Sequence, residues 1–439
     1  MTASTQSGGS AAPHAPESDS GSTPPLWSRK DWGLVAACSA LMGTSSGVYY
    51  TASVFFVALI KEFQWNYAST AGVFSLFTIV FGVWGILVGH LVDRVGARRV
   101  VLAGGLVLAA ALVGNGWASA RWHLYVTHSI LSALGLAATS YVPVSYILTR
   151  RFSDQRGLAF GIASAGVGIG IMVLVPAAQL FISLWGWRTA YRVLAAIISL
   201  VIFPVGFFTL REAEGVPPPG EGKPRAAGPV FLPDDSIPQD WSLASALGNR
   251  AFWLVAATYV FLNGPTQLVL THQAAHLAEA GQAKMLVAGI VGLVGLFSVP
   301  AKIGWGTLSD RVWLELIYLA GSLCIAAACL ALLAIGPASP AWSLYGYAAL
   351  MGFGYAVSAS MNPILAGRFF MGRRFGIILG TLNTFQQAGA AIGIWLAGYG
   401  HDVTGSYQLS LLGAMVSVGL ASACIWLAAP RRIGLERAV

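Results

Sequence analysis

The chain has 439 residues, of which 56% are hydrophobic and only 10% are charged. This apolar content, with a mean hydropathy of +0.69, is more than a soluble protein of this length could bury in its interior. It places the chain in a lipid bilayer. The formal net charge of +8 is scattered over short turns and forms no basic stripe, which argues against a nucleic-acid partner.

The N-terminal segment consists mostly of small and polar residues. Residues 1–26 are rich in Ser, Gly, Pro and Ala and lack the basic start and apolar core of a signal peptide, so we expect a disordered cytoplasmic tail. The four cysteines of the chain all lie in apolar runs, where a thiol behaves as a small hydrophobe. They have no disulfide framework and no zinc spacing, and we expect neither a metal nor a cofactor.

About 20 apolar residues cross the hydrocarbon core as a helix, and at this length the sequence predicts twelve spans. They are 32–60, 68–91, 99–118, 123–148, 157–183, 188–210, 251–275, 285–308, 314–335, 341–367, 375–400 and 406–429. A Pro-rich polar stretch separates the sixth span from the seventh. We therefore expect an all-α membrane protein with six-helix bundles at 27–210 and 250–430, a cytoplasmic linker at 211–249 and a tail at 431–439.

The positions of Lys and Arg predict the orientation, because basic loops stay in the cytoplasm. With the N-terminus inside, the cytoplasmic segments hold 19 of the 25 basic residues, the outer loops hold five, and Lys302 lies within a span. Both termini are therefore expected to be cytoplasmic, in a multi-pass protein of the inner or plasma membrane.

A short motif occurs twice. Gly89-His90-Leu91-Val92-Asp93-Arg94-Val95 returns as Gly306-Thr307-Leu308-Ser309-Asp310-Arg311-Val312, with five identities at a displacement of 217 residues. The same displacement relates Arg151-Phe152 to Arg368-Phe369 and Arg156 to Arg373. Internal duplication of this kind is typical of secondary transporters, so we interpret the chain as two copies of one membrane unit.

The first copy, extended as Gly89-x-Leu91-x-Asp93-Arg94-x-Gly96-x-Arg98-Arg99, resembles the signature loop of the major facilitator superfamily. The resemblance implies two pseudo-symmetric six-helix bundles that transport a solute by alternating access. A carboxylate and a guanidinium at neighbouring helix ends can bond each other, while Gly lets the helices approach closely. We assign a gating or conformational role to Gly89, Asp93, Arg94, Gly306, Asp310, Arg311, Arg151 and Arg156.

Within the superfamily, the fifth span is most similar to monocarboxylate transporters. The similarity lies in Arg150-Arg151-x4-Arg156-Gly157-Leu158-Ala159-x-Gly161, which continues as a helix of small residues. Many members of that group have a lysine in the first span and an acid and a base in the eighth. Tyr50, Gly295 and Val299 stand at those positions here, so all three charges are missing.

Lys302 is the charge that remains inside a span. Oxalate–formate exchangers, a related group, resemble this chain but are expected to carry basic residues in the eighth and eleventh spans, and only the eighth has one here. A charged side chain within the bilayer is costly, so we interpret it by default as a functional residue. The alternative is a lysine that extends its amine to the interface or packs between helices, because its four-carbon stem could reach that far.

The seventh span contains three polar candidates, Asn263, Gln267 and His272, together with Gly264-Pro265. We expect Gly264-Pro265 to interrupt the helix. Broken helices often border a substrate cavity. Hydrogen bonds that merely hold the helices together are the alternative for the amides. His272 is the leading candidate for a coupled proton, since an imidazole changes charge near neutral pH.

Further polar residues occur in four other spans. In the eleventh, Gln386 and Gln387 cannot share a helix face, and we favour Asn383 with Gln387, at i and i+4, as residues that face a cavity. Tyrosines and an amide in the first, fourth and tenth spans are cavity candidates by the resemblance, with ordinary packing as the alternative. These residues are Tyr49, Tyr50, Tyr141, Tyr355 and Asn362.

The sequence thus predicts a secondary active transporter, expected to be a monomer, that moves a small organic anion. A carrier for a neutral or bulkier solute is the first alternative, because the charges of the family are missing. A membrane sensor or a membrane enzyme is the second, but no large soluble domain and no nucleophile–base pair supports either.

Overall fold

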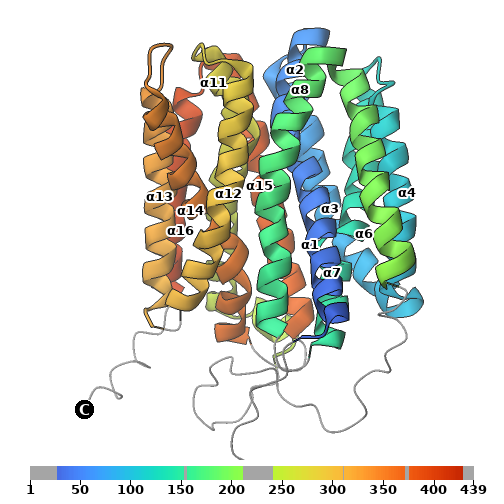
Figure 1. Cartoon of the computed structure of the whole chain (residues 1–439). Coiled ribbons are helices and arrows are strands. Elements are labelled where there is room, and N and C mark those ends of the chain that lie inside the picture. The colour runs from blue at the N-terminus through green and yellow to red at the C-terminus, as the bar shows by residue number, and fades with distance from the viewer. Residues whose placement is uncertain (1–26, 153–155, 211–240, 310, 371–374, 429–439) are drawn as a thin grey trace, which may run out of the picture.

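The computed structural model describes residues 27–152, 156–210, 241–309, 311–370 and 375–428, without the side chains of residues 93, 149, 150 and 156–158. Within these ranges the regular structure is helical (Figure 1). The predicted tails and most of the predicted linker lie outside the described residues, as does Asp310. Below, the upper end of the bundle is the end at which Figure 1 labels α2, and the lower end is the end at which it labels α7.

The first half contains six crossings. Their elements are α1 (Arg29–Tyr50) with α2 (Ala52–Phe63); α3 (Tyr67–Val95); α4 (Ala97–Asn115); α5 (Arg121–Leu124) with the π-helix η1 (Tyr125–Ser132), α6 (Ala133–Thr139) and α7 (Tyr141–Arg151); and α8 (Arg156–Pro204) with the π-helix η2 (Val205–Thr209). The last pair crosses twice, because Gly186, at φ 78° and ψ 161°, breaks α8 at the upper end.

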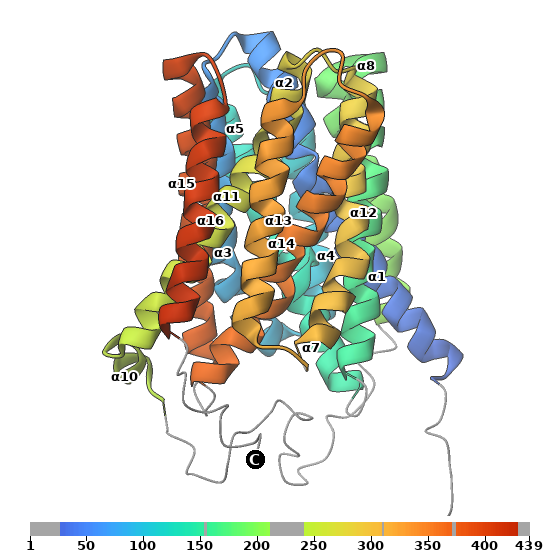
Figure 2. The same cartoon turned by 90° about the vertical axis from the view of Figure 1, so that its left-hand side faces the viewer.

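The second half begins with a short helix, α10 (Leu243–Leu247), which lies at the end of the predicted linker and at the lower end of the bundle (Figure 2). Six long helices follow. They are α11 (Arg250–Glu279), α12 (Lys284–Leu308), α13 (Leu314–Ala334), α14 (Ala341–Phe370), α15 (Phe375–Thr404) and α16 (Gln408–Ala428).

By length and composition, nine helical segments of the described residues could cross a membrane. One of them, Ala159–Thr209, has 51 residues, which is enough for two crossings with the bend at Gly186. Helices α14 and α15 lie outside these nine segments, but each has 30 residues, which is long enough for one crossing. The described chain is therefore an all-α membrane protein whose helices are consistent with six crossings in each half, and the repeated motif falls at the lower ends of α3 and α12.

The two halves meet along two helix pairs, α3 with α15 and α8 with α12. Their contact is uneven from end to end. Of the ten buried residues of α15, eight lie between Gly389 and His401, in its upper part. Below Thr78, only Val88 and Val92 are buried among the α3 residues whose side chains are described. Along the α3–α15 pair, the halves are thus closely packed at the upper end and exposed at the lower end.

Glycines bring α1 and α8 into backbone contact within the first half. A Cβ on Gly43 would lie 2.7 Å from the carbonyl oxygen of Gly166, and one on Gly170 would lie 1.9 Å from that of Gly43. Real Cβ contacts are longer, so only glycine fits there. The small-residue helix of the fifth span therefore packs closely against α1.

The predicted break at Gly264-Pro265 was wrong, because α11 continues from Arg250 to Glu279. Proline lacks the N–H that would bond the carbonyl four residues earlier, here that of Phe261. The Ser417 hydroxyl on α16 donates to this carbonyl at 2.9 Å and compensates for the missing bond. Gly264 instead allows close packing, since a Cβ there would lie 3.1 Å from the carbonyl oxygen of Gly389 on α15.

Candidate functional site

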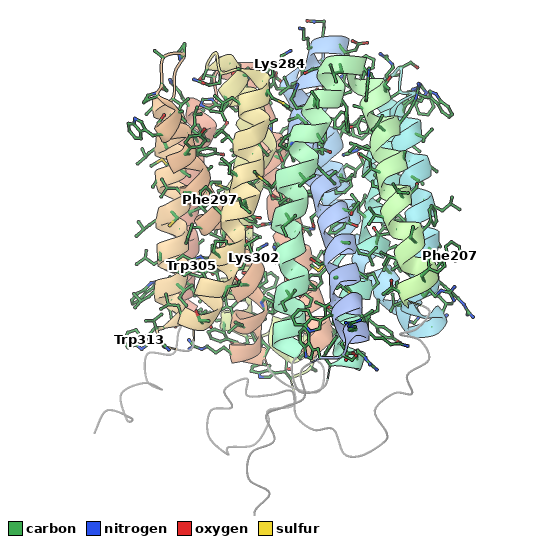
Figure 3. All side chains as sticks on the ribbon, viewed as in Figure 1. Phe207, Lys284, Phe297, Lys302, Trp305 and Trp313 are labelled. Atoms are coloured by element: carbon green, nitrogen blue, oxygen red, sulfur yellow. The ribbon has the colours of Figure 1, made fainter. Side chains whose placement is uncertain are left out.

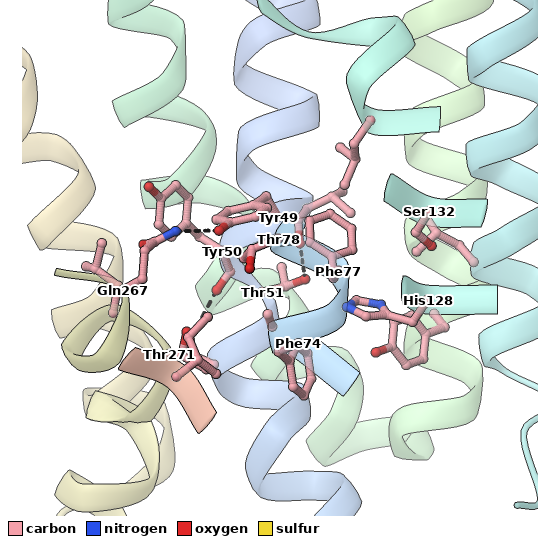
Figure 4. A pocket seen from close by; sticks show the side chains of 18 residues that line it. Tyr49, Tyr50, Thr51, Phe74, Phe77, Thr78, His128, Ser132, Gln267 and Thr271 are labelled. Carbon is pink, nitrogen blue, oxygen red and sulfur yellow. Dashed lines mark hydrogen bonds between the residues drawn. The ribbon is translucent and has the colours of Figure 1, made fainter. Parts of the chain in front are cut away.

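A small cavity lies between α1 and α11 in the upper part of the bundle. Its volume is about 30 Å³, room for one or two waters, and it is bounded by polar and aromatic side chains (Figure 4). Gln267 on α11 donates a hydrogen bond from Nε2 to the Tyr49 hydroxyl on α1 and so joins the two halves. The polar side chains around it are those of Tyr49, Tyr50, Thr51, Ser53, Thr78, His128, Ser132, Gln267 and Thr271.

An aromatic row extends from this cavity into the second half. The ring of Tyr50 lies 4.9 Å from that of Tyr49 and 6.4 Å from that of Tyr355 on α14, centroid to centroid. The Tyr355 hydroxyl donates to Ser298 Oγ at 2.8 Å. Four predicted site residues, Tyr49, Tyr50, Gln267 and Tyr355, are thus brought together from both halves.

Lys302 lies at the end of this row. Its Nζ is 5.5 Å from the centre of the Tyr355 ring, within the range of a cation–π interaction, and Figure 3 labels it on α12. No carboxylate in the described part of the chain lies within salt-bridge distance of this amine. A half-buried lysine with only a ring face as its partner retains hydrogen-bonding capacity for an anion.

Two other predicted site residues belong to a separate amide network inside the second half. Asn362 donates from Nδ2 to Gln386 Oε1 at 3.0 Å and accepts at Oδ1 from the Tyr318 hydroxyl at 2.7 Å, and its carbonyl accepts from the Tyr259 hydroxyl. Asn263 donates from Nδ2 to the carbonyl oxygen of Gln386 at 2.9 Å. These contacts correspond to the alternative, in which amides hold helices together.

The remaining candidates are dispersed. Asn383 is exposed on the lower part of α15, and a Cβ on Gly82 of α3 would lie 3.0 Å from Gln387 Cγ, so Gln387 packs at the boundary between the halves. Tyr141 is 50% exposed, and its ring lies 5.1 Å from that of Phe160, away from the aromatic row. Of this group, only Gln387 approaches the opposite half.

His272 lies deep in the second half with both ring nitrogens engaged. Nε2 is 3.0 Å from the carbonyl oxygen of Ile394, which can only accept, so Nε2 carries a proton. Nδ1 is 3.0 Å from the Tyr407 hydroxyl, which can donate to a neutral ring or accept from a charged one. The ring is only 2% exposed and packs edge-on against Phe56 of α2, 4.7 Å away.

Four residues at the upper end, Tyr67, Glu279, His401 and Asp402, form what we call the upper latch. The two carboxylate oxygens of Asp402 on α15 accept hydrogen bonds from the backbone N–H groups of Tyr67 and Ala68, at 2.8 and 2.7 Å, at the start of α3. The Tyr67 hydroxyl donates to Glu279 on α11 at 2.6 Å. His401 lies 3.2 Å from the other Glu279 oxygen and stacks on the Tyr67 ring. The latch therefore joins the two halves where they pack most closely.

The residues assigned to gating lie mainly at the lower end. Arg151 bonds Asp31 of its own half at 2.8 Å. A Cβ on Gly89 would make only ordinary contact with Val142, and one on Gly306 would have no neighbouring atom within 4 Å, so neither glycine makes the predicted close approach. Arg94 and Arg311 are exposed, and the side chains of Asp93 and Arg156 lie outside the described residues.

Several polar residues of the cavity were not predicted from the sequence, among them His128, Ser132, Thr78 and Thr271. His128 and Ser132 are four residues apart within a span, which is a signal that could have placed both on one face. Thr78 and Thr271 carry no such signal, because isolated threonines are common in membrane helices.

Two packed helical halves that enclose polar groups inside an apolar bundle are the architecture of a membrane transporter. The family model for the Major Facilitator Superfamily matches residues 34–394. The chain belongs to this superfamily, as the resemblance of its loops predicted, and it is therefore a transporter and not an enzyme.

Similar proteins agree with this assignment. Human monocarboxylate transporter 11 is 27% identical over 92% of this chain and 83% of its own length, and rat monocarboxylate transporter 13 is 26% identical over 88% and 87%. The solved structure of a bacterial homologue of the human lysosomal transporter Spinster has a TM-score of 0.67 at 16% identity, and the match covers 92% of this chain and 98% of that one. The relatedness to monocarboxylate transporters and the fold of two helical bundles are thus confirmed.

Proposed function

We propose that the protein is a secondary active transporter that moves a small organic anion across the membrane by alternating access. Lys302 carries the proposal, because it is a cation without a carboxylate partner in the described residues and lies beside a ring at the boundary between the halves. A charge held in this way inside a membrane protein needs a counter-ion, and an anionic substrate supplies one.

The aromatic row gives each neighbour of Lys302 a distinct role. Lys302 attracts the carboxylate, while Tyr355 and Tyr50 present ring faces to its apolar part. The Tyr50 hydroxyl accepts no hydrogen bond and donates none among the described residues, so it is available to a ligand oxygen. Tyr49 and Gln267 close the row above, because their bond has to break before the halves can separate there.

Alternating access is supported by the uneven packing of the halves. The upper latch closes one end, and the boundary helices are exposed at the other. With the orientation predicted from Lys and Arg, the exposed end faces the cytoplasm, so the protein is open inward in this state. Rocking of one bundle against the other would then break the latch and open the outer side.

Proton coupling forms the second part of the proposal. His272 remains the candidate, because a carbonyl and a hydroxyl can both accept from a protonated ring, so the charged form would keep both contacts. His272 is also buried and distant from solvent, which makes a proton pathway a separate requirement.

The test is counterflow in proteoliposomes with a panel of carboxylates at two pH values. We expect at least one small carboxylate to exchange, and Lys302→Ala to lower its uptake about a hundred-fold or more, as expected when a charged partner is lost. Unchanged uptake by a folded Lys302→Ala protein would favour a neutral or bulkier solute, which the uncharged cavity could also accept. Exchange that does not depend on pH would remove the proton from the proposal.

A further inference from the structure

A groove lies between α12 and α14 at the lower end of the second half. Its volume is about 340 Å³. Gly304, Trp305 and Leu308 on α12 and Phe353 on α14 form most of its wall. One charged residue also lines it, Arg311, which follows the end of α12. The groove is therefore apolar along its length and basic at its lower end.

The groove is separate from the aromatic row. Phe353 and Tyr355 are two residues apart on α14, so their side chains point to nearly opposite sides of the helix. The Tyr355 hydroxyl bonds Ser298 inside the bundle, whereas Phe353 is 38% exposed. On α12, Ile303 beside the groove is 58% exposed. The groove therefore faces the surrounding membrane and not the interior of the bundle.

Trp305 fixes one wall of the groove. Its indole Nε1 donates to the carbonyl oxygen of Phe353 at 2.9 Å, and this bond ties α12 to α14. Figure 3 labels Trp305 on α12 and Trp313 below it, at the turn into α13. Tryptophans gather where acyl chains meet headgroups, so this part of the molecule is expected at the membrane interface.

Gly304 leaves the groove open between these walls. A Cβ at this position would have no neighbouring atom within 4 Å. In a bilayer, an acyl chain fills an apolar hollow of this kind, because an empty one would forgo the dispersion contacts of its wall. The shape of the groove therefore points to a lipid chain as its occupant.

Arg311 determines which lipid the groove prefers. It is exposed and forms no salt bridge with the described residues, whereas Arg368 at the same end pairs with Glu315 at 3.7 Å. A guanidinium binds two phosphate oxygens at once, and basic pockets between membrane helices on the cytoplasmic side bind anionic headgroups. The charge of Arg311 is thus complementary to an anionic headgroup above which the chain lies in the groove.

We propose that this groove binds an anionic phospholipid, whose phosphate pairs with Arg311 and one of whose acyl chains lies along Gly304 and Phe353. With the orientation predicted from Lys and Arg, the lipid comes from the cytoplasmic leaflet. Thr307, Leu308 and Arg311 of the second copy of the repeated motif line the site, so this copy has a binding role of its own. The inference does not depend on which solute is transported.

Photo-crosslinking of the full-length protein tests the site. The protein is placed in phosphatidylcholine vesicles with a trace of phosphatidylglycerol that carries a diazirine on one acyl chain, and adducts are mapped by mass spectrometry. We expect adducts within residues 301–308 and at Phe353. One arginine near the surface favours the anionic lipid about five-fold, so replacing half of the phosphatidylcholine by unlabelled phosphatidylglycerol should lower the yield about three-fold. An unchanged yield, or no adduct in these segments, would overturn the site.

Three variants separate the charge from the groove. Arg311→Gln should make the yield insensitive to unlabelled phosphatidylglycerol, and Arg311→Lys should keep the sensitivity because it keeps the charge. Gly304→Leu fills the groove, leaves Arg311 in place and should lower the yield about five-fold or more. Sensitivity that persists in Arg311→Gln would overturn the choice of an anionic lipid.

Gly289→Leu is the matched control for the groove. It lies on the same helix, and a Cβ there also meets no atom within 4 Å, but it does not line the groove. Its yield should equal that of the wild type. An equal loss in Gly289→Leu and Gly304→Leu would overturn the placement of the acyl chain between α12 and α14.

Discussion

Hydrogen bonds inside the second half differ from those that cross to the first half. The amide network around Asn362 connects α11, α13, α14 and α15, which all belong to the second half. The bonds of Tyr49 with Gln267 and of Tyr67 with Glu279 join opposite halves. The first kind can persist through a transport cycle, and the second kind has to break in it.

Bonds within one half therefore affect the stability of the fold, and bonds between the halves affect the equilibrium between the two open states. A bond that is present in both open states lowers the free energy of both equally, so its loss destabilises the fold without shifting the balance between them. A bond present in one state alone shifts that balance by its own free energy. Chemically similar polar residues in one bundle therefore have different functional consequences.

The largest effect on stability is expected for Asn362→Leu. The change removes two side-chain hydrogen bonds and leaves the Tyr318 hydroxyl and Gln386 Oε1 without their partner. We expect the free energy of unfolding to fall by about 2 kcal/mol, a value at the modest end because bonds in membrane proteins are worth little individually. Thermal unfolding of the purified protein measures this loss of stability, and the KM of the folded protein should not change. An altered KM with normal stability would reverse the assignment.

The upper latch provides the next test, since Asp402→Asn removes a charge that accepts from two backbone N–H groups. We expect the upper end to open more often, by up to about ten-fold, which corresponds to ~1.4 kcal/mol. The readout is the rate at which an impermeant maleimide labels Thr271→Cys, beneath the latch, after the four native cysteines have been replaced.

Glu62→Gln is the matched control for the latch. Glu62 bonds Arg188 at 2.7 Å at the same end of the molecule, but both residues belong to the first half. Its loss should leave the labelling rate unchanged. Equal acceleration by both variants would mean that the surface charge of this end, and not the latch, controls opening.

Adjacent glutamines allow a smaller comparison on one helix. Gln386→Leu should cost about 1 kcal/mol of stability, because its side chain accepts from Asn362. Gln387→Leu should leave stability unchanged and alter the labelling rate of Thr271→Cys, because Gln387 packs on Gly82 of the opposite half. Thermal unfolding and labelling of both variants decide the matter, and a reversed pattern would contradict the distinction.

Tyr49→Phe should have the smallest effect. It keeps the ring in the aromatic row and removes only the hydroxyl that accepts from Gln267. A single neutral bond across the halves is worth about 0.5 kcal/mol in a membrane protein, so we expect about a two-fold change in KM. Counterflow with the best carboxylate of the panel measures this, and a loss of ten-fold or more would indicate that the hydroxyl contacts the substrate directly.

The fold could be predicted from the sequence because its signals are local. Apolar runs of spanning length and a motif repeated at 217 residues predict two helical halves without reference to any long-range contact. The continuous helix at Pro265 could not be predicted, because it depends on Ser417, which lies 156 residues away from the carbonyl that it bonds.

The candidate site was harder to predict, because a polar residue in a span says nothing about its neighbours. Tyr50 and Asn362 were equivalent candidates in the sequence, yet one borders the opposite half and the other bonds its own. His128 was not predicted, because its place at the cavity depends on the π-helix η1, which the sequence does not indicate. Which helix faces which is a property of the folded bundle alone.

The glycine contacts between α1 and α8 have a consequence for measuring motion. Backbone packs directly against backbone at Gly43 and Gly170, and the Leu174 side chain packs on Gly47, so we expect the two helices to move as one body. They have to travel together, so a spectroscopic probe attached to one reports the displacement of the other. Two probes, one at the upper end of α2 and one at the upper end of α16, would suffice to follow the whole excursion by distance measurements.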